Sequence, residues 1–254
     1  MKKVLGISCV MLALTATTAL AYAGLNLSWG PECASDALMI NKNFACTTNN
    51  GSSIIVASFV PNASHERLLA VDAVIDGQPS SYSTRVFPDW WQFKNVGACR
   101  IAALSTNTTI SGNAVNCLDA WSGQGTPTID YYGDPVLVGI PVPPVQGRRA
   151  RIKVGCWVPA ESASAVEEGF EYFVFNVVVN HTKTVGTGSC TDCLVPMCWA
   201  FNSIMPGYED GGVNNAETLI NPILNFEITW QGGPGCYGDA AQNRTWGQIK
   251  SLYR

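Results

Sequence analysis

Charged side chains are scarce in this sequence, and histidine is almost missing from it. Asp, Glu, Lys and Arg together make up 13% of the 254 residues, and there are only two histidines. The 15 Lys and Arg do not outnumber the 19 Asp and Glu, so the basic surface that nucleic-acid binding requires is not expected. Glycine shows no three-residue period and the apolar residues show no heptad, which excludes collagen-like and coiled-coil chains. With 47% hydrophobic residues, the chain can bury a sizeable core rather than stay disordered.

Long apolar runs are missing everywhere except at the N-terminus, where the pattern is that of a secretory signal peptide. Two lysines precede an apolar stretch over 4–20, and Ala21 and Ala23 put small residues at the −3 and −1 positions of a cleavage site. The stretch contains threonines and is shorter than the roughly 20 residues of a membrane span. We predict that residues 1–23 are removed, which takes the net charge from −4 to −6. The mature chain is expected to be extracellular or periplasmic, with no membrane insertion.

Nine cysteines follow the predicted cleavage site, and an oxidising compartment would join most of them in disulfides. An odd number leaves at least one unpaired. The expected disulfide cysteines are Cys33, Cys46, Cys99, Cys117, Cys190, Cys193, Cys198 and Cys236. Pairing across short loops favours Cys33 with Cys46 and Cys99 with Cys117, and the last four then form a third cluster.

That third cluster also has the composition of a metal or redox site. Four thiolates would suit tetrahedral zinc, and Cys190 and Cys193 form a Cys-x-x-Cys motif. Thiols oxidise outside the cytosol, and no βαβ pattern surrounds the motif, so disulfides are favoured over both alternatives. We expect no metal and no cofactor.

Apolar residues alternate with polar ones at period two along most of the chain, which predicts β-strands. The strongest candidates are 53–60, 69–76, 149–158, 170–180, 198–205 and 224–230, and weaker ones are 25–29, 43–46, 87–93, 115–121 and 136–140. Both alternating sets of 170–180 are apolar, so this strand is expected to be central and covered on both faces. The connection over 122–147 is rich in Gly, Pro and Tyr and is expected to be an exposed, turn-rich loop.

These strands predict an all-β fold, an antiparallel β-sandwich or jelly-roll-like single domain over 24–242 that is stapled by disulfides. The exception is the C-terminal tail, 243–254, where Thr245 can cap a short helix. That helix would place Trp246, Ile249 and Tyr253 on one side, and we expect the tail to pack on the domain.

The two faces of strand 149–158 differ sharply. Cys156 shares its face with Ala150, Ile152 and Val154, so it is the expected unpaired thiol, buried and inert. The opposite face carries Arg149, Arg151, Lys153 and Trp157. Cations beside an aromatic ring could hold an anionic sugar or a phosphate-bearing polymer. The simpler alternative is a solvated outer face.

Aromatic residues are the second signal for binding. The chain has eight tryptophans, and several aromatics lie in turn-rich segments rather than in the strongest strands, namely Trp90, Trp91, Trp121, Tyr131 and Tyr132. Exposed rings on a sandwich can serve as stacking platforms for sugars. The alternative is that these rings fill or cap the hydrophobic core.

Signals for catalysis are weak. His65 and His181 both fall in turn or surface patterns, and there is no Gly-x-Ser-x-Gly motif and no Cys–His pair, so a hydrolytic triad is not expected. A glycosidase with two carboxylates stays open because such pairs meet only in space. The acids near aromatics are Asp89, Asp119, Asp130, Asp134, Glu171 and Glu227, and the sequence does not select a pair.

Three segments carry a resemblance to known sequences: Asp89–Arg100, Lys183–Cys193 and the Trp246–Arg254 ending, of the form Trp-Gly-x-Ile-Lys-x-Leu-Tyr-Arg. In these segments the chain resembles a group of uncharacterised secreted bacterial proteins of similar length, to which no activity is assigned. The resemblance implies secretion and a bacterial source, and it transfers no catalytic residue.

Together these observations favour a secreted, non-catalytic binding or extracellular structural protein, with a polysaccharide or cell-surface component as its expected partner. Binding of a glycan through exposed aromatics is the sharpest form of this hypothesis. A carbohydrate-active enzyme of jelly-roll architecture and a self-associating surface or filament subunit are the alternatives. The sequence does not predict an oligomeric state.

Overall fold

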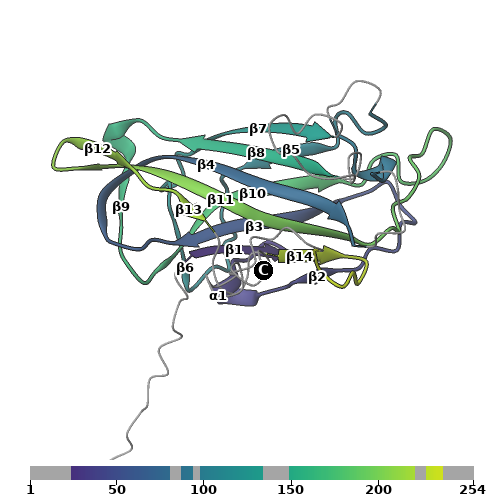
Figure 1. Cartoon of the computed structure of the whole chain (residues 1–254), viewed down its shortest axis with the longest axis horizontal. Coiled ribbons are helices and arrows are strands. Elements are labelled where there is room, and N and C mark those ends of the chain that lie inside the picture. The colour runs from purple at the N-terminus through teal and green to yellow at the C-terminus, as the bar shows by residue number, and fades with distance from the viewer. Residues whose placement is uncertain (1–23, 81–86, 94–97, 134–148, 221–226, 237–254) are drawn as a thin grey trace, which may run out of the picture.

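The computed structural model describes residues 24–80, 87–93, 98–133, 149–220 and 227–236, which form two β-sheets packed face to face (Figure 1). The predicted all-β sandwich is therefore confirmed. The predicted signal peptide at 1–23, the strand at 136–140 and the helical tail at 243–254 lie outside the described residues. Within the described ranges, none of the helices has the length and apolar character needed to cross a membrane.

The first sheet has the order β1-β3-β10-β5, and β6 pairs with β10 as well. Its strands are β1 (Gly24–Trp29), β3 (Ser52–Val60), β5 (Leu104–Asn107), β6 (Cys117–Asp119) and β10 (Glu171–Asn180). All pairings are antiparallel except that of β6 with β10. Nearly every side chain of β10 is buried, as predicted for a central strand covered on both faces.

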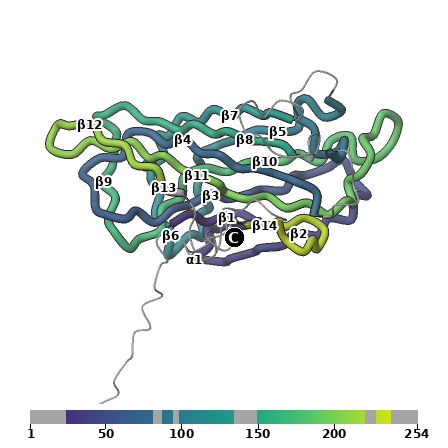
Figure 2. The backbone as a smooth tube through the Cα atoms, in the orientation of Figure 1, coloured from purple at the N-terminus to yellow at the C-terminus, as the bar shows by residue number. Residues whose placement is uncertain are grey.

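The second sheet has the order β2-β14-β11-β4-β8-β7, with β12 and β13 pairing with β11 and β9 pairing with β4. Its strands are β2 (Asn41–Lys42), β4 (His65–Pro79), β7 (Thr126–Gly133), β8 (Ala150–Trp157), β9 (Ser164–Val166), β11 (Met197–Asp210), β12 (Val213–Ala216), β13 (Leu219–Ile220) and β14 (Glu227–Trp230). The longest strands, β4 and β11, lie side by side (Figure 2). In the part of the chain that the structure describes, helical structure is limited to α1 (Ala34–Ala37) and the 3₁₀ turns Asp89–Trp91 and Ala160–Ser162.

Three of the predicted segments are wrong. Segment 87–93 forms a 3₁₀ turn at Asp89–Trp91 instead of a strand, because Pro88 starts a turn that inserts two indoles into the core. Residues 43–46 are not a strand, since the short β2 ends at Lys42. The expected exposed loop over 122–147 contains the eight-residue strand β7, which pairs with β8 along its whole length.

Four disulfides join the chain, Cys33–Cys117, Cys46–Cys193, Cys99–Cys190 and Cys198–Cys236. All eight predicted disulfide cysteines are therefore used, but the predicted short-range pairs Cys33–Cys46 and Cys99–Cys117 are wrong. The reason is topological: Cys33 follows β1 in the first sheet, whereas Cys46 follows β2 in the second. Cys156 is unpaired and buried, as its position on the inner face of β8 predicts.

Candidate functional site

Three of the predicted stacking residues lie in the core rather than on the surface. Trp90, Trp91 and Trp121 have no exposed surface. The ring of Trp90 stacks on Trp230 with centroids 5.2 Å apart, and Trp91 contacts Trp199 at 5.1 Å. The prediction that these indoles form a sugar platform is therefore wrong. The alternative, that they fill and cap the core, is the correct one.

Hydrogen bonds hold these rings in place. Trp121 donates its indole N–H to the carbonyl oxygen of Val174 at 2.6 Å. Tyr131, another predicted binding residue, is buried and donates its hydroxyl to the carbonyl oxygen of Trp91 at 2.7 Å. Burial raises the pKa of Tyr131 above its usual value. Like the three indoles, Tyr131 is not available to a ligand on the surface.

Arg100 is buried against the Trp90 ring, and the sequence patterns did not identify it. The guanidinium carbon of Arg100 lies 3.6 Å from the ring centroid of Trp90. Its N–H groups donate to the carbonyl oxygens of Trp90, Asn180 and Thr182. No carboxylate in the described part of the chain pairs with it, so Arg100 acts as a clamp between backbone segments.

The sequence predicts a turn or surface position for His181; it lies in the connection directly after β10 but is buried, so the surface alternative is wrong. Its Nε2 atom lies 2.9 Å from Ser53 Oγ, and its Nδ1 atom lies 3.1 Å from the carbonyl oxygen of Asn50. The ring also stacks on Phe44 with centroids 3.9 Å apart, and burial lowers the pKa of His181. This Ser–His pair has no access to a substrate, because Ser53 is 1% exposed and His181 is 7% exposed.

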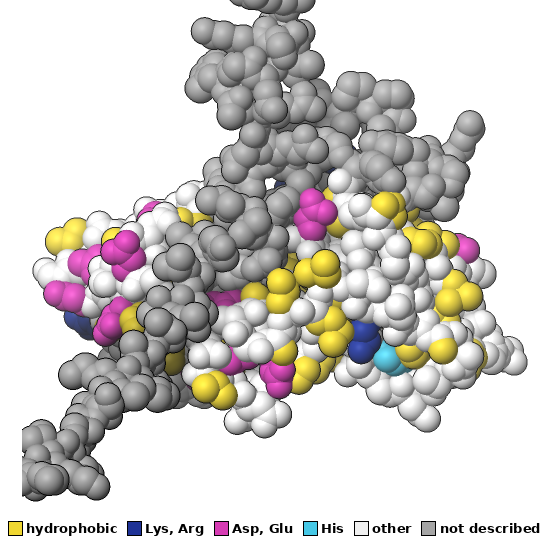
Figure 3. Space-filling view, turned by 90° about the horizontal axis from the view of Figure 1, so that it is seen from below, with side chains coloured by type: hydrophobic (Ala, Val, Ile, Leu, Met, Phe, Trp, Pro, Cys, Tyr) yellow, Lys and Arg dark blue, Asp and Glu magenta, His cyan; other side chains and the backbone are white. Residues whose placement is uncertain are grey.

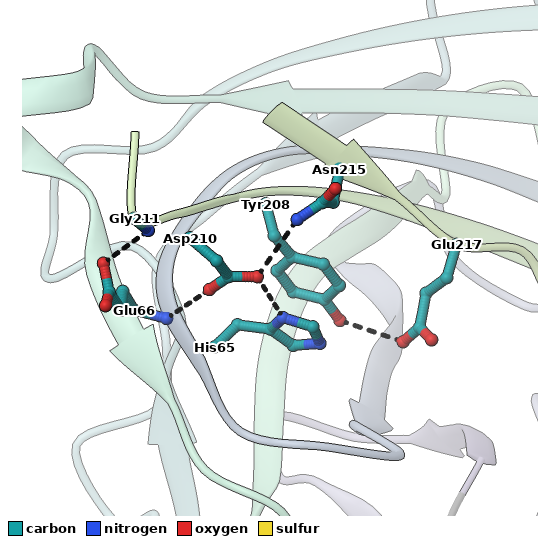
Figure 4. A network of polar contacts seen from close by, with 7 residues as sticks. All are labelled: His65, Glu66, Tyr208, Asp210, Gly211, Asn215 and Glu217. Carbon is teal, nitrogen blue, oxygen red and sulfur yellow. Dashed lines mark hydrogen bonds and ion pairs between the residues drawn. The ribbon is translucent and has the colours of Figure 1, made fainter. Parts of the chain in front are cut away.

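His65 is held between a carboxylate and an aromatic ring (Figure 4). Its Nδ1 atom lies 2.8 Å from Asp210 Oδ2, and its ring stacks on Tyr208 with centroids 3.6 Å apart. Hydrogen bonds from His65 and from the Glu66 amide lower the pKa of Asp210. The other ring nitrogen, Nε2, is buried and has no hydrogen-bond partner in the described ranges. Within the described ranges, no serine, threonine or cysteine side chain lies within hydrogen-bond distance of Nε2.

The other predicted binding residues lie together on what we call the outer face, the solvent side of β7, β8 and β4. Tyr132 on β7 is 43% exposed, and Trp157 on β8 is 49% exposed. The register pairs Tyr132 with Arg151 and Asp130 with Lys153. Since opposite residues in a sheet point to the same side, these side chains share one surface.

Charges on the outer face largely balance. Arg151 donates Nε and one terminal nitrogen to the two carboxylate oxygens of Asp76, both at 2.7 Å. The ammonium of Lys153 lies 5.5 Å from the ring centroid of Tyr132. Arg149 is half-buried and has a partner of its own. The predicted row of cations is therefore a mixed surface, because acids from β4 and β7 lie next to it.

A hollow of about 280 Å³, including the part open to solvent, lies on the outer face next to this ion pair. Its described lining residues are Asp76, Gly77, Gln78, Arg149, Ala200, Asn202 and Cys236. Asp76 supplies the one carboxylate among them. The hollow therefore lacks the pair of acids that a glycosidase needs among its described lining residues.

Acids that the sequence placed near aromatics mostly have structural partners. Glu171 is buried and accepts hydrogen bonds from Asn26, Ser58 and the Ser35 amide. Asp119 accepts from the amides of Trp121 and Gly123, so it fixes a turn. Asp134 lies outside the described residues.

Potential metal ligands come together at one place in the described ranges. Ligand atoms of Cys198, Glu227 and Cys236 lie within 4.8 Å of one another. The two sulfurs form a disulfide and so cannot act as thiolates, and Glu227 accepts a hydrogen bond from the Cys236 amide at 3.0 Å. Because Cys190 and Cys193 are also in disulfides, the zinc and redox alternatives for this cluster are wrong.

A second exposed surface is apolar. Figure 3 shows the side of the molecule near α1 and β2, where hydrophobic side chains reach the surface. Leu38, Met39 and Ile40, which connect α1 to β2, are all exposed. Their backbone is fixed, since the carbonyls of Met39 and Ile40 accept hydrogen bonds from Trp29 and Thr229. Exposed apolar segments of this kind suit protein contacts.

Comparisons with known proteins add no function. No protein-family model matches the sequence, and no curated protein matches it either.

Proposed function

We propose that the protein is a secreted, non-catalytic carbohydrate-binding protein that binds a polysaccharide on the outer face of β7, β8 and β4. The observation that carries this proposal is the exposure of Trp157, a large ring that stays in solvent although seven other tryptophans are in the same chain. An exposed indole on a rigid sheet offers a large apolar face, with a polar N–H at its edge, on which a sugar ring can stack. The four disulfides support this proposal, because such bonds form in oxidising extracellular or periplasmic compartments, where polysaccharides are available.

Small residues surround Trp157 and leave its ring accessible. Ala70 on β4 and Thr126 on β7 lie directly opposite it in the sheet, and Gly207 on β11 lies beyond Ala70. Gly155 is the next outward-facing residue on β8 itself. None of these described sheet neighbours is bulky, so they leave room for one face of a sugar ring to stack on the indole.

A carboxylate beside Trp157 supplies a hydrogen-bond acceptor. Asp72 is exposed and lies opposite Gly155 in the sheet. Its carboxylate leans over this glycine, since a Cβ atom added to Gly155 would lie 3.4 Å from Asp72 Oδ1. Asp72 forms no hydrogen bond or ion pair within the described ranges, so it can accept from sugar hydroxyls. Its charge also disfavours an anionic ligand at this position. Because Arg151 is already neutralised by Asp76, an uncharged polysaccharide suits this face better than an anionic one.

The test is isothermal titration calorimetry of residues 24–254 with a panel of soluble polysaccharides, both uncharged and anionic. We expect saturable binding of an uncharged member. The Trp157→Ala variant should bind it at least about fivefold more weakly, since stacking of a ring on an aromatic face contributes about 1 kcal/mol or more. Trp157→Phe should bind with intermediate affinity.

The matched control is Leu194→Ala, which also removes an exposed hydrophobic side chain, and it should bind like the wild type. Absence of binding across the panel would overturn the proposal. So would a Trp157→Ala variant with unchanged affinity.

A second candidate, self-association, rests on the exposed Leu38, Met39 and Ile40. Sedimentation at increasing protein concentration tests it, with a Met39→Asp variant for comparison. A monomer at every concentration would rule it out.

A further inference from the structure

The polar hollow on the outer face is built by an irregularity in β11. The register between β4 and β11 shifts between Phe201 and Ser203, so that Asn202 is an extra residue with no partner opposite. Such a bulge redirects a side chain. Here Asn202 is turned to the outer face, where its amide donates to Asp76 Oδ2.

Asp76, one of the residues that line the hollow, is held by three hydrogen bonds. The fork of Arg151 binds both of its carboxylate oxygens, and Asn202 binds one of them from the opposite side. A carboxylate with three donors in this arrangement keeps its position without a ligand. The hollow is therefore preorganised, and a ligand would not have to order these side chains on binding.

The lining identifies the chemistry of the ligand. The walls are planar polar groups, namely a carboxylate, the amides of Gln78 and Asn202, and the guanidinium of Arg149. Gly77 and Ala200 are small, and no aromatic or large aliphatic side chain is among the described lining residues. Such a surface offers both donors and acceptors to adjacent hydroxyls, and it offers little to an apolar ligand. Its positive and negative groups offset each other, so it does not select a charged ligand.

We propose that this hollow is a second sugar subsite, which binds one uncharged sugar unit of the same polysaccharide that contacts Trp157. This inference rests on the proposed function. The hollow reaches about 280 Å³ only when its solvent-open part is included, so a sugar ring would lie across its mouth and reach the polar lining with its hydroxyls rather than fill an enclosed pocket. Asp76 lies six residues along β4 from Ala70, the residue opposite Trp157, which is about 20 Å in a strand. Several linked sugar units would span that distance.

The experiment uses oligosaccharides of increasing length, prepared from the polysaccharide that binds best, in calorimetric titrations of the mature chain. In the wild type, affinity should rise with length until one molecule reaches both subsites. The Asn202→Ala and Gln78→Ala variants should each bind the long oligosaccharides about fivefold more weakly, because each loses a hydrogen bond worth about 1 kcal/mol. They should bind the short ones like the wild type, since these contact Trp157 alone.

The control is Asn113→Ala, which removes an exposed asparagine amide outside this face and should bind every length like the wild type. If Asn202→Ala and Gln78→Ala bind long oligosaccharides as tightly as the wild type while Trp157→Ala does not, the hollow is not a subsite and the proposed function stands. If the wild type binds no oligosaccharide or polysaccharide, both proposals fall.

Discussion

At the scale of single residues, the surroundings of His181 favour its neutral form. Burial lowers the pKa of its imidazole, the hydrogen bond to the Asn50 carbonyl partly opposes this, and the charges of Arg100 and Lys42 add to the lowering. In the unfolded chain the pKa returns to about 6.5. Below that pH the unfolded chain binds more protons than the folded protein, so stability is lost as the pH falls toward the lower folded-state pKa.

We therefore expect the free energy of unfolding, measured with urea, to decrease from about pH 7 to about pH 5. In the His181→Gln variant this decrease should be smaller, because the titrating group is gone. His65→Gln is the control and should keep the decrease. Asp210 does not contribute to this decrease, because its pKa is lowered and its titration therefore changes the free energy of unfolding only below about pH 3.8. An unchanged pH dependence in His181→Gln would contradict the assignment.

Cys156 is a second residue whose chemistry follows from burial. It lies on the core side of β8, and burial raises the pKa of its thiol to about 12, with a smaller contribution from Asp72. A thiol with that pKa has almost no thiolate at neutral pH. We expect a thiol reagent to leave the folded protein unlabelled and to label one thiol per mature chain in denaturant. Rapid labelling of the native protein would show that Cys156 is accessible.

At the scale of elements, a close contact joins β4 to β11. Gly77 lies opposite Trp199, and a Cβ atom at Gly77 would be 2.4 Å from the indole ring. The Gly77→Ala variant should therefore lose about 2 kcal/mol or more of unfolding free energy in urea denaturation, because the ring cannot move away within the core. Gly112→Ala is the matched control, since a Cβ atom there meets nothing within 4 Å. Equal stability of the two variants would refute this packing argument.

The sequence predicted the strands in which apolar and polar residues alternate at neighbouring positions. Burial alternates along β8 as its sequence does, and the outer face of that strand follows from parity alone. β7 was missed because Pro127 and Gly133 give it the composition of a loop. Its pairing with β8, which brings Tyr132 next to Arg151, depends on contacts that the local pattern does not contain. The sequence therefore predicted the side chains that β8 contributes to the candidate site, but not the pairing of β8 with β7.

At the scale of the whole molecule, the interactions that sequence patterns miss are those between distant segments. Arg100 was not identified because its partners, Asn180 and Thr182, lie 80 and 82 residues away. The hollow depends on a bulge at Asn202 that faces Asp76, 126 residues earlier. Composition indicates that this chain has a hydrophobic core and disulfides, whereas the positions of the candidate sites depend on which strands pair.

The disulfides show how strongly the whole fold depends on these distant contacts. Cys46 and Cys193 are 147 residues apart, and Cys198 and Cys236 are 38 apart. Closing such loops restricts the unfolded chain, with a stabilisation of about 4–5 kcal/mol in the chain-entropy model. We expect the Cys46→Ala/Cys193→Ala double variant to lose about 2–5 kcal/mol of unfolding free energy in urea denaturation.

Peptide mapping of the wild type without reduction should recover all four disulfide pairs. Recovery of Cys33 with Cys46 would contradict the structure, because these cysteines flank different sheets.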